Sequence, residues 1–481
     1  MVRVTVLSLM AAALLVASDP IGLLERAGPQ TMSAALGQTP QDTLQVEPLS
    51  ANDISWLFPA PASDADLAKL ISMRDLTAND GAIWSEEAFQ QFLAIAAGPA
   101  GSVEGTTHRI GLPAEVRTRD VWYVSSVRMD PGAPGLSPGL VKQFGRSPQI
   151  RLSVQPITHT PDGGLKVYDI AVHLAFSFTM TNANGDPVYD LPIEVGCFPR
   201  PKANVEAFKA IIADLVALRD TLKNGQVTTA RPLGIHPGLK NTNTATRTRD
   251  EMKALLERHL SRNRLNLMTV AALSADSDKA WIFLPIFNVP PNVDPSRPTG
   301  GFVPLPSPAL DGRHYAQLFN AAANRYKVVP IPYTNNRSGP TCRHAALPIP
   351  GPPIDDRVGA DTALMLMNDA QAPSDGILRD INTLVDPDAS HMFNTDCVSC
   401  HTETKIGIDL LRSNSHIKED IDKLLLPDTI WNVRGFGWFP RRNGPAQPTV
   451  SHRVGKETFA VLTFINERCL PRPEATCMPD Q

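Results

Sequence analysis

Residues 168–180 read Tyr168-Asp169-Ile170-Ala171-Val172-His173-Leu174-Ala175-Phe176-Ser177-Phe178-Thr179-Met180, and large apolar side chains alternate with small or polar ones. A period of two over this length is typical of a β-strand that buries one face. His173 lies on the opposite face of the strand. We therefore expect a long strand here, with His173 as a surface or second-layer residue rather than a metal ligand.

The same pattern occurs on the N-terminal side of this strand. Ile150, Leu152 and Val154 alternate with polar residues, and Asp162-Gly163-Gly164 between the two runs is typical of a hairpin loop. We predict an antiparallel sheet over residues 120–196. Apolar residues three or four apart predict three helices: one that begins after Ser85, one over 204–223 and one over about 249–262. The apolar run 281–287 is predicted to be a buried strand. These elements indicate an α+β fold.

A different signal occurs near the C-terminus, where Cys397-Val398-Ser399-Cys400-His401 has the spacing of a c-type haem attachment site. Two thiols at this spacing can add to the vinyl groups on one edge of a porphyrin, and the histidine then binds the iron as proximal ligand. With 6 cysteines and 11 histidines in 481 residues, about 0.002 chance matches are expected per chain. We predict one covalent haem c on Cys397, Cys400 and His401.

Two other chemistries use paired cysteines. A structural zinc site would need the adjacent Cys400 and His401 on one metal with Cys397 and a distant fourth ligand, and no second pair at finger spacing occurs. A thioredoxin-like dithiol would follow an apolar strand, whereas Asn394-Thr395-Asp396 precedes this pair. Both are weaker alternatives to haem. The rest of the chain has no phosphate-binding loop, His-Glu-x-x-His or Gly-x-Ser-x-Gly motif.

The N-terminus has the features of a secretory signal peptide over residues 1–18. One arginine precedes the apolar run Val4–Ala17, and small residues stand at the expected cleavage site. An uncleaved anchor is the alternative. No later stretch approaches 18 apolar residues, so we expect no membrane span in the mature chain and a periplasmic or secreted location. A net charge of −4 gives no reason to expect nucleic acid as a partner.

Four cysteines remain outside the haem motif, an even number that fits an oxidising compartment. Three pairings are possible. We favour a disulfide between Cys469 and Cys477 across a short Pro-rich loop, which leaves Cys197 and Cys342 as the second pair. Free buried thiols are the alternative.

The 44 prolines predict long irregular connections and help to place domain boundaries. We expect a linker over 19–63, an α+β domain with the antiparallel sheet over 64–200, and a mixed helical and strand domain over 201–346. Residues 347–353 are rich in proline and mark the next boundary. The haem domain is then expected over 355–481.

Residues 391–402 resemble the class I cytochrome c domain, in which a short helix ends before the haem cysteines and an apolar residue such as Phe393 stands four before the first. Residues 456–466 look like the final helix of that family. The resemblance covers the last quarter of the chain and implies a small all-α domain that carries one haem. It also implies attachment outside the cytoplasmic membrane in bacteria, which agrees with export.

The chain departs from that family at the second face of the iron. The family usually places a methionine in the loop before the last helix, but no methionine lies between His401 and Lys456. We favour His452 as the distal ligand. The other candidates are His416, Met478, His391, Met392 or an open sixth position. Arg434, Arg441 and Arg442 are candidate partners of the haem propionates, and residues 435–439 are candidate aromatic walls of the pocket.

Three functions are consistent with these features. The favoured hypothesis is an exported single-haem c-type cytochrome that exchanges one electron at a time with a redox partner protein. The second is a peroxidase-like haem enzyme with an open sixth iron position, although di-haem bacterial peroxidases need two such motifs and this chain has one. The third is a haem-based sensor or binding module. An electron carrier is favoured over a catalyst.

Overall fold

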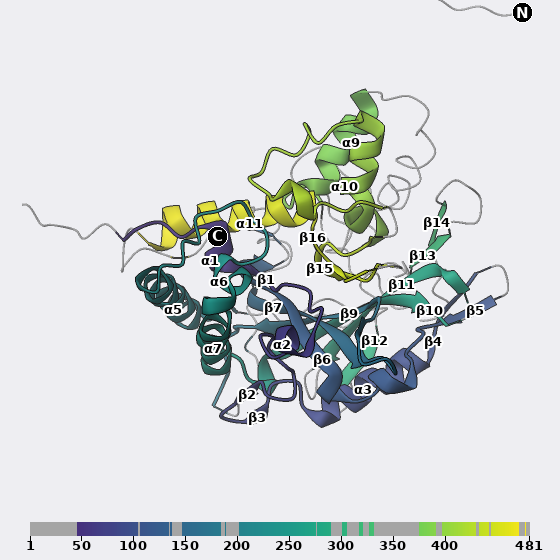
Figure 1. The fold of residues 1–481 in the computed structure, drawn as a ribbon, viewed down its shortest axis with the longest axis horizontal. Coiled ribbons are helices and arrows are strands. Elements are labelled where there is room, and N and C mark those ends of the chain that lie inside the picture. The colour runs from purple at the N-terminus through teal and green to yellow at the C-terminus, as the bar shows by residue number, and fades with distance from the viewer. Residues whose placement is uncertain are drawn as a thin grey trace, which may run out of the picture. The chain divides into compact units, whose positions relative to one another are not determined.

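In the part of the chain that the structure describes, a large antiparallel sheet of eight strands forms the centre of the fold (Figure 1). Seven of its strands follow the order β1-β6-β7-β9-β10-β11-β12, and β8 pairs with β7. Their bounds are β1 Ser55–Leu57, β6 Trp122–Ala133, β7 Ser147–His159, β8 Leu165–Val167, β9 Ile170–Ser177, β10 Leu265–Ser274, β11 Ser277–Val289 and β12 Gly301–Pro304. The antiparallel sheet and the accompanying helices make the protein α+β, as expected.

The computed structural model describes residues 46–103, 106–133, 135–136, 147–183, 188, 202–275, 277–289, 301–304, 317–320, 327–330, 375–390, 397–429, 432–441, 444–470 and 477. The described residues all belong to one compact unit. The predicted signal peptide, the Pro-rich boundary at 347–353, and Cys197 and Cys342 lie outside the described residues. Among the described residues, no helix combines the length and apolar character that a membrane crossing requires.

The alternating stretch forms β9, which is shorter than the expected 168–180. Gln149 of β7 pairs with Ser177 of β9, and the residue before Gln149 in β7 is Pro148. Proline has no backbone N–H, so the ladder stops there, although Phe178 still donates to the Pro148 carbonyl at 2.7 Å. The expected hairpin turn joins β7 to β8, and Gly163 adopts a φ of +83° that favours glycine.

One face of the sheet is apolar and packs against helices. Leu152, Leu174 and Met268 lie on this face, in the same buried cluster as residues of α3 (Glu86–Ala97), α5 (Val205–Asn224) and α7 (Thr242–His259). The helix predicted from Ser85 is confirmed, since the Ser85 hydroxyl caps it by accepting from the Ala88 N–H. Each large apolar side chain buried here contributes about 1.5–3 kcal/mol.

The other face of the sheet is polar and is also covered. Ser126, Ser153, His173 and Thr269 stand in one row across β6, β7, β9 and β10. A hairpin of β15 (Phe436–Phe439) and β16 (Gln447–Val450) packs on this side, away from α3 (Figure 1). Ser126 donates to the Phe436 carbonyl at 2.9 Å, and Gln155 exchanges two hydrogen bonds with the Trp438 backbone. The polar face is therefore a buried interface.

The C-terminal segment contains α9 (Asp375–Val385), α10 (Cys397–Leu411) and α11 (His452–Phe464) as well as this hairpin. The expectation of an all-α segment is therefore corrected for its described part. The Gly435–Phe439 stretch, which we expected to line a pocket, places Trp438 in the core, where its indole N–H donates to the Phe58 carbonyl at 2.9 Å. Alternating glycine and aromatic residues suit a strand packed closely on another sheet.

Segments that we expected to be separate domains share the sheet. β9 from 64–200 pairs with β10 from 201–346 over the length of both strands. The end of the expected linker contributes α1 (Ala51–Ile54) and β1, and Trp56 of β1 is completely buried. The remaining elements are short: α2 Asp64–Leu67, α6 Pro237–Lys240, and the hairpins β2 Thr77–Ala78 with β3 Gly81–Ala82, β4 Pro99–Val103 with β5 Thr106–Arg109, and β13 Gln317–Asn320 with β14 Lys327–Pro330.

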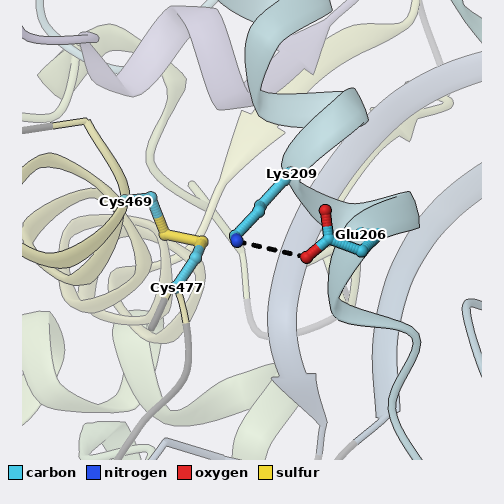
Figure 2. The surroundings of a disulfide bond; sticks show 4 residues. All are labelled: Glu206, Lys209, Cys469 and Cys477. Carbon is cyan, nitrogen blue, oxygen red and sulfur yellow. Dashed lines mark hydrogen bonds and ion pairs between the residues drawn. A yellow bond between two sulfur atoms is a disulfide. The ribbon is translucent and has the colours of Figure 1, made fainter. Parts of the chain in front are cut away.

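The chain after α11 is closed by the expected disulfide between Cys469 and Cys477. Figure 2 shows this bond facing α5, where Lys209 and Glu206 form an ion pair at 3.1 Å. Cys477 is buried in the main apolar cluster. The disulfide therefore closes a loop within the C-terminal segment, next to α5.

Candidate haem-attachment site

The haem motif lies in the first turns of α10, which begins at Cys397. Residues 400 and 401 follow residue 397 by three and four positions, so both lie on the same side of the helix as residue 397. The structure describes the side chains of Cys400 and His401, and that of Cys400 is partly buried. The helix therefore presents the motif on one side, as attachment of two thiols and one imidazole to the same group requires.

His401 has the hydrogen bond that orients a metal-binding histidine. Its Nδ1 lies 2.5 Å from the Val433 carbonyl oxygen, which only accepts, so Nδ1 carries the proton and donates it. The Nε2 lone pair is then left for a metal. Burial lowers the pKa of His401 to about 4, although the bond to Val433 opposes this shift. The imidazole is therefore neutral at physiological pH, which is the form that binds metals.

Two residues of the sheet lie beside the His401 ring. The Phe283 ring of β11 has its centre 4.9 Å away, and the His173 ring of β9 has its centre 6.4 Å away. Burial lowers the pKa of His173 to about 3, and the positive charge of Arg434 acts in the same direction, as does His401 when it is protonated. We had expected His173 to be a surface or second-layer residue. The structure places it opposite the motif histidine.

Arg434 forms a buried ion pair close to this histidine pair. Its Nη2 lies 3.0 Å from Asp169 Oδ1, and its side chain is 3% exposed. Burial raises the pKa of Asp169 to about 6, and the attraction of Arg434 does not overcome that effect. Arg441 is an exposed residue paired with Asp428, and Arg442 lies outside the described residues. Propionate binding by these arginines stays a prediction.

A second charge network joins the helices of the C-terminal segment to the sheet. Glu457 of α11 lies 2.5 Å from both Arg453 and Arg128, and these two arginines hold the pKa of Glu457 far below its usual value despite its burial. Arg453 also donates to the carbonyls of Leu384 and Ser390 at 2.8 Å, which ties the end of α9 to α11. Cys400 interacts electrostatically with Arg453. The motif therefore stands in a region held by several buried charges.

His452, the favoured distal ligand, is the first residue of α11. Its backbone N–H donates to Thr404 Oγ1 at 2.7 Å, and its Nε2 lies 2.5 Å from Glu419 Oε2. Its ring contacts the His416 ring with centres 5.6 Å apart. The His452 side chain therefore contacts Glu419 and His416. Its role as the distal iron ligand stays a prediction. The candidates His391, Met392 and Met478 lie outside the described residues.

The residues at the motif fit a covalent haem. A neutral His401 with Nδ1 bonded and Nε2 available, next to the Cys400 thiol, is the donor set that a c-type haem uses. No group of three or more His, Cys, Asp or Glu side chains in the described part of the chain is placed to hold a bare metal ion. A haem iron needs at most two protein ligands, because the porphyrin supplies four nitrogens.

No known family model, curated protein or solved structure matches the chain.

Proposed function

We propose that the protein is an exported, single-haem c-type cytochrome that carries single electrons to or from a redox partner protein. Cys397 and Cys400 would hold the haem through thioether bonds, and His401 would bind the iron. When bound, haem c supplies an iron that changes between the ferric and ferrous states. The periplasmic or secreted location rests on the signal-like residues 1–18 and on the need for haem attachment outside the cytoplasm.

The observation that carries the proposal is the hydrogen bond from His401 Nδ1 to the Val433 carbonyl within a Cys-x-x-Cys-His motif. This bond fixes the ring orientation and the tautomer, and it raises the basicity of Nε2. The buried setting would also limit solvent rearrangement when the charge of a bound iron changes by one.

The pyridine haemochrome spectrum tests the proposal. The full-length chain is produced in a host with the haem c maturation machinery, beside a Cys397→Ala/Cys400→Ala variant. We expect a c-type spectrum with one haem per chain in the parent and none in the variant. A Cys469→Ser/Cys477→Ser variant loses as many cysteines elsewhere and should keep the haem. A parent protein without covalent haem would refute the proposal.

The peroxidase-like enzyme and the sensor differ from an electron carrier in the sixth iron position. An electron carrier should show a low-spin, six-coordinate spectrum and no reaction with carbon monoxide. A redox titration should then follow a single one-electron step. High-spin ferric iron that binds carbon monoxide and turns over peroxide would favour the enzyme instead.

A further inference from the structure

The His173 imidazole on the sheet faces the His401 imidazole of the haem motif. His173 lies in the middle of β9, between Ser153 of β7 and Thr269 of β10. The centres of the two histidine rings are 6.4 Å apart, and their planes differ by 57°. These residues are 228 positions apart in sequence (401 minus 173), and the packing of the C-terminal segment on the polar face brings them together.

This spacing matches two imidazoles on opposite sides of one iron. A metal–imidazole bond is about 2.0 Å long, and each ring nitrogen lies about 1.15 Å from its ring centre. Two axial imidazoles on one iron therefore have their ring centres about 6.3 Å apart. The observed 6.4 Å agrees with this value and lies at the long end of the range of about 4.5–7 Å over which aromatic rings contact one another.

The local chemistry of His173 also suits ligation. Among the residues that the structure describes, none forms a hydrogen bond with its imidazole, and part of the side chain remains accessible. His452 differs, because its Nε2 lies 2.5 Å from Glu419.

The geometry points to His173 as the second axial ligand of the haem held by Cys397, Cys400 and His401, an inference that rests on the proposed function. The iron would then join α10 to the central sheet. A pair of imidazoles gives a lower potential than histidine with methionine and closes the sixth position to small ligands. The large N-terminal region thereby has a role in the redox centre, because it supplies one of the two ligands.

The test compares full-length holoproteins carrying His173→Ala, His452→Ala or no substitution. We expect the parent and His452→Ala to be low-spin and six-coordinate, with ferrous forms that do not bind carbon monoxide. His173→Ala should give high-spin ferric iron and a carbon monoxide complex, and added imidazole should restore the low-spin spectrum. A His173→Met variant should stay low-spin with a higher midpoint potential.

The pyridine haemochrome spectrum distinguishes an error in the His173 assignment from an error in the proposed haem attachment. If every variant keeps one covalent haem but His173→Ala stays low-spin and unreactive to carbon monoxide, His173 is not the ligand. A high-spin spectrum in His452→Ala alone would assign the role to His452 instead. A parent protein that lacks the c-type signature would overturn the proposed function itself, and the ligand assignment with it.

Discussion

The Asp169–Arg434 pair predicts a specific dependence of stability on pH. Burial raises the pKa of Asp169 from 3.8 to about 6 in the folded chain. Between about pH 4 and pH 6 the folded chain therefore keeps a proton at Asp169 that the unfolded chain has released. Protons bound preferentially by the folded state make the unfolding free energy fall as pH rises. At about 1.4 kcal/mol per pKa unit, the full fall from this group is about 3 kcal/mol.

The Asp169→Asn variant cannot titrate and should lack this fall. Arg434 stays charged throughout this range, so Asp169 is the member of the pair that titrates. We expect the unfolding free energy of the variant minus that of the parent to rise by about 2.5 kcal/mol between pH 4 and pH 7. Urea unfolding followed by far-ultraviolet circular dichroism at several pH values measures this difference.

An exposed pair provides the matched control. Asp428 pairs with Arg441, and both side chains are nearly half exposed, so solvent screens their interaction. For Asp428→Asn, the unfolding free energy of the variant minus that of the parent should change by less than about 1 kcal/mol between pH 4 and pH 7. A constant or falling difference for Asp169→Asn would show that burial does not dominate the environment of this carboxyl.

Three further predictions concern the contacts that hold the C-terminal segment. Cys469→Ser/Cys477→Ser opens a loop with a sequence separation of 8 and should lower the unfolding free energy by about 2.5 kcal/mol, and reductant should destabilise the parent by the same amount. Gly437→Ala would place a methyl group 2.7 Å from Gln155 Oε1 and should cost about 1–3 kcal/mol in urea unfolding, because Gln155 cannot move without losing its bonds to Trp438. Arg453→Leu removes the donors to two buried carbonyls and should cost about 3–5 kcal/mol, whereas Arg441→Leu should cost less than about 1 kcal/mol by thermal unfolding.

Local sequence pattern predicted the elements whose signals are local. The period of two in β7 and β9 and the Asp162–Gly164 turn identified the hairpin and its antiparallel partner correctly. β10 was not predicted, because Leu265–Ser274 is rich in leucine and alanine and its strand conformation depends on pairing with β9 and β11. α7 begins at Thr242, capped by Asn241, and not at about 249 as predicted. The first two turns of the helix contain few apolar residues, so their helical period is not visible in the sequence.

The covering of the polar face could not be inferred from any local pattern. Alternation placed His173 on the polar side of its strand, and a polar side is ordinarily expected to face solvent. The structure fills that side with the segment that carries Phe436 and Trp438, which lies more than 250 residues later in the chain. The proximity of His173 to His401 follows from that packing alone.

The motif itself was visible in the sequence, but its supporting contact was not. Cys-x-x-Cys-His is defined by side-chain identity at fixed spacing, so residue letters suffice to find it. The partner of His401 is the backbone carbonyl of Val433, and any residue at position 433 could supply such a group. The sequence alone therefore suffices to propose the motif, whereas the contact that orients its histidine depends on the fold.

The intact mass of the purified chain under denaturing conditions shows directly whether a haem is covalently attached. After expression with the haem c maturation machinery, we expect one population, heavier than the polypeptide by a single haem that denaturant does not remove. The same measurement on Cys397→Ala/Cys400→Ala should give the polypeptide mass alone. A parent chain at the bare polypeptide mass would contradict covalent haem attachment.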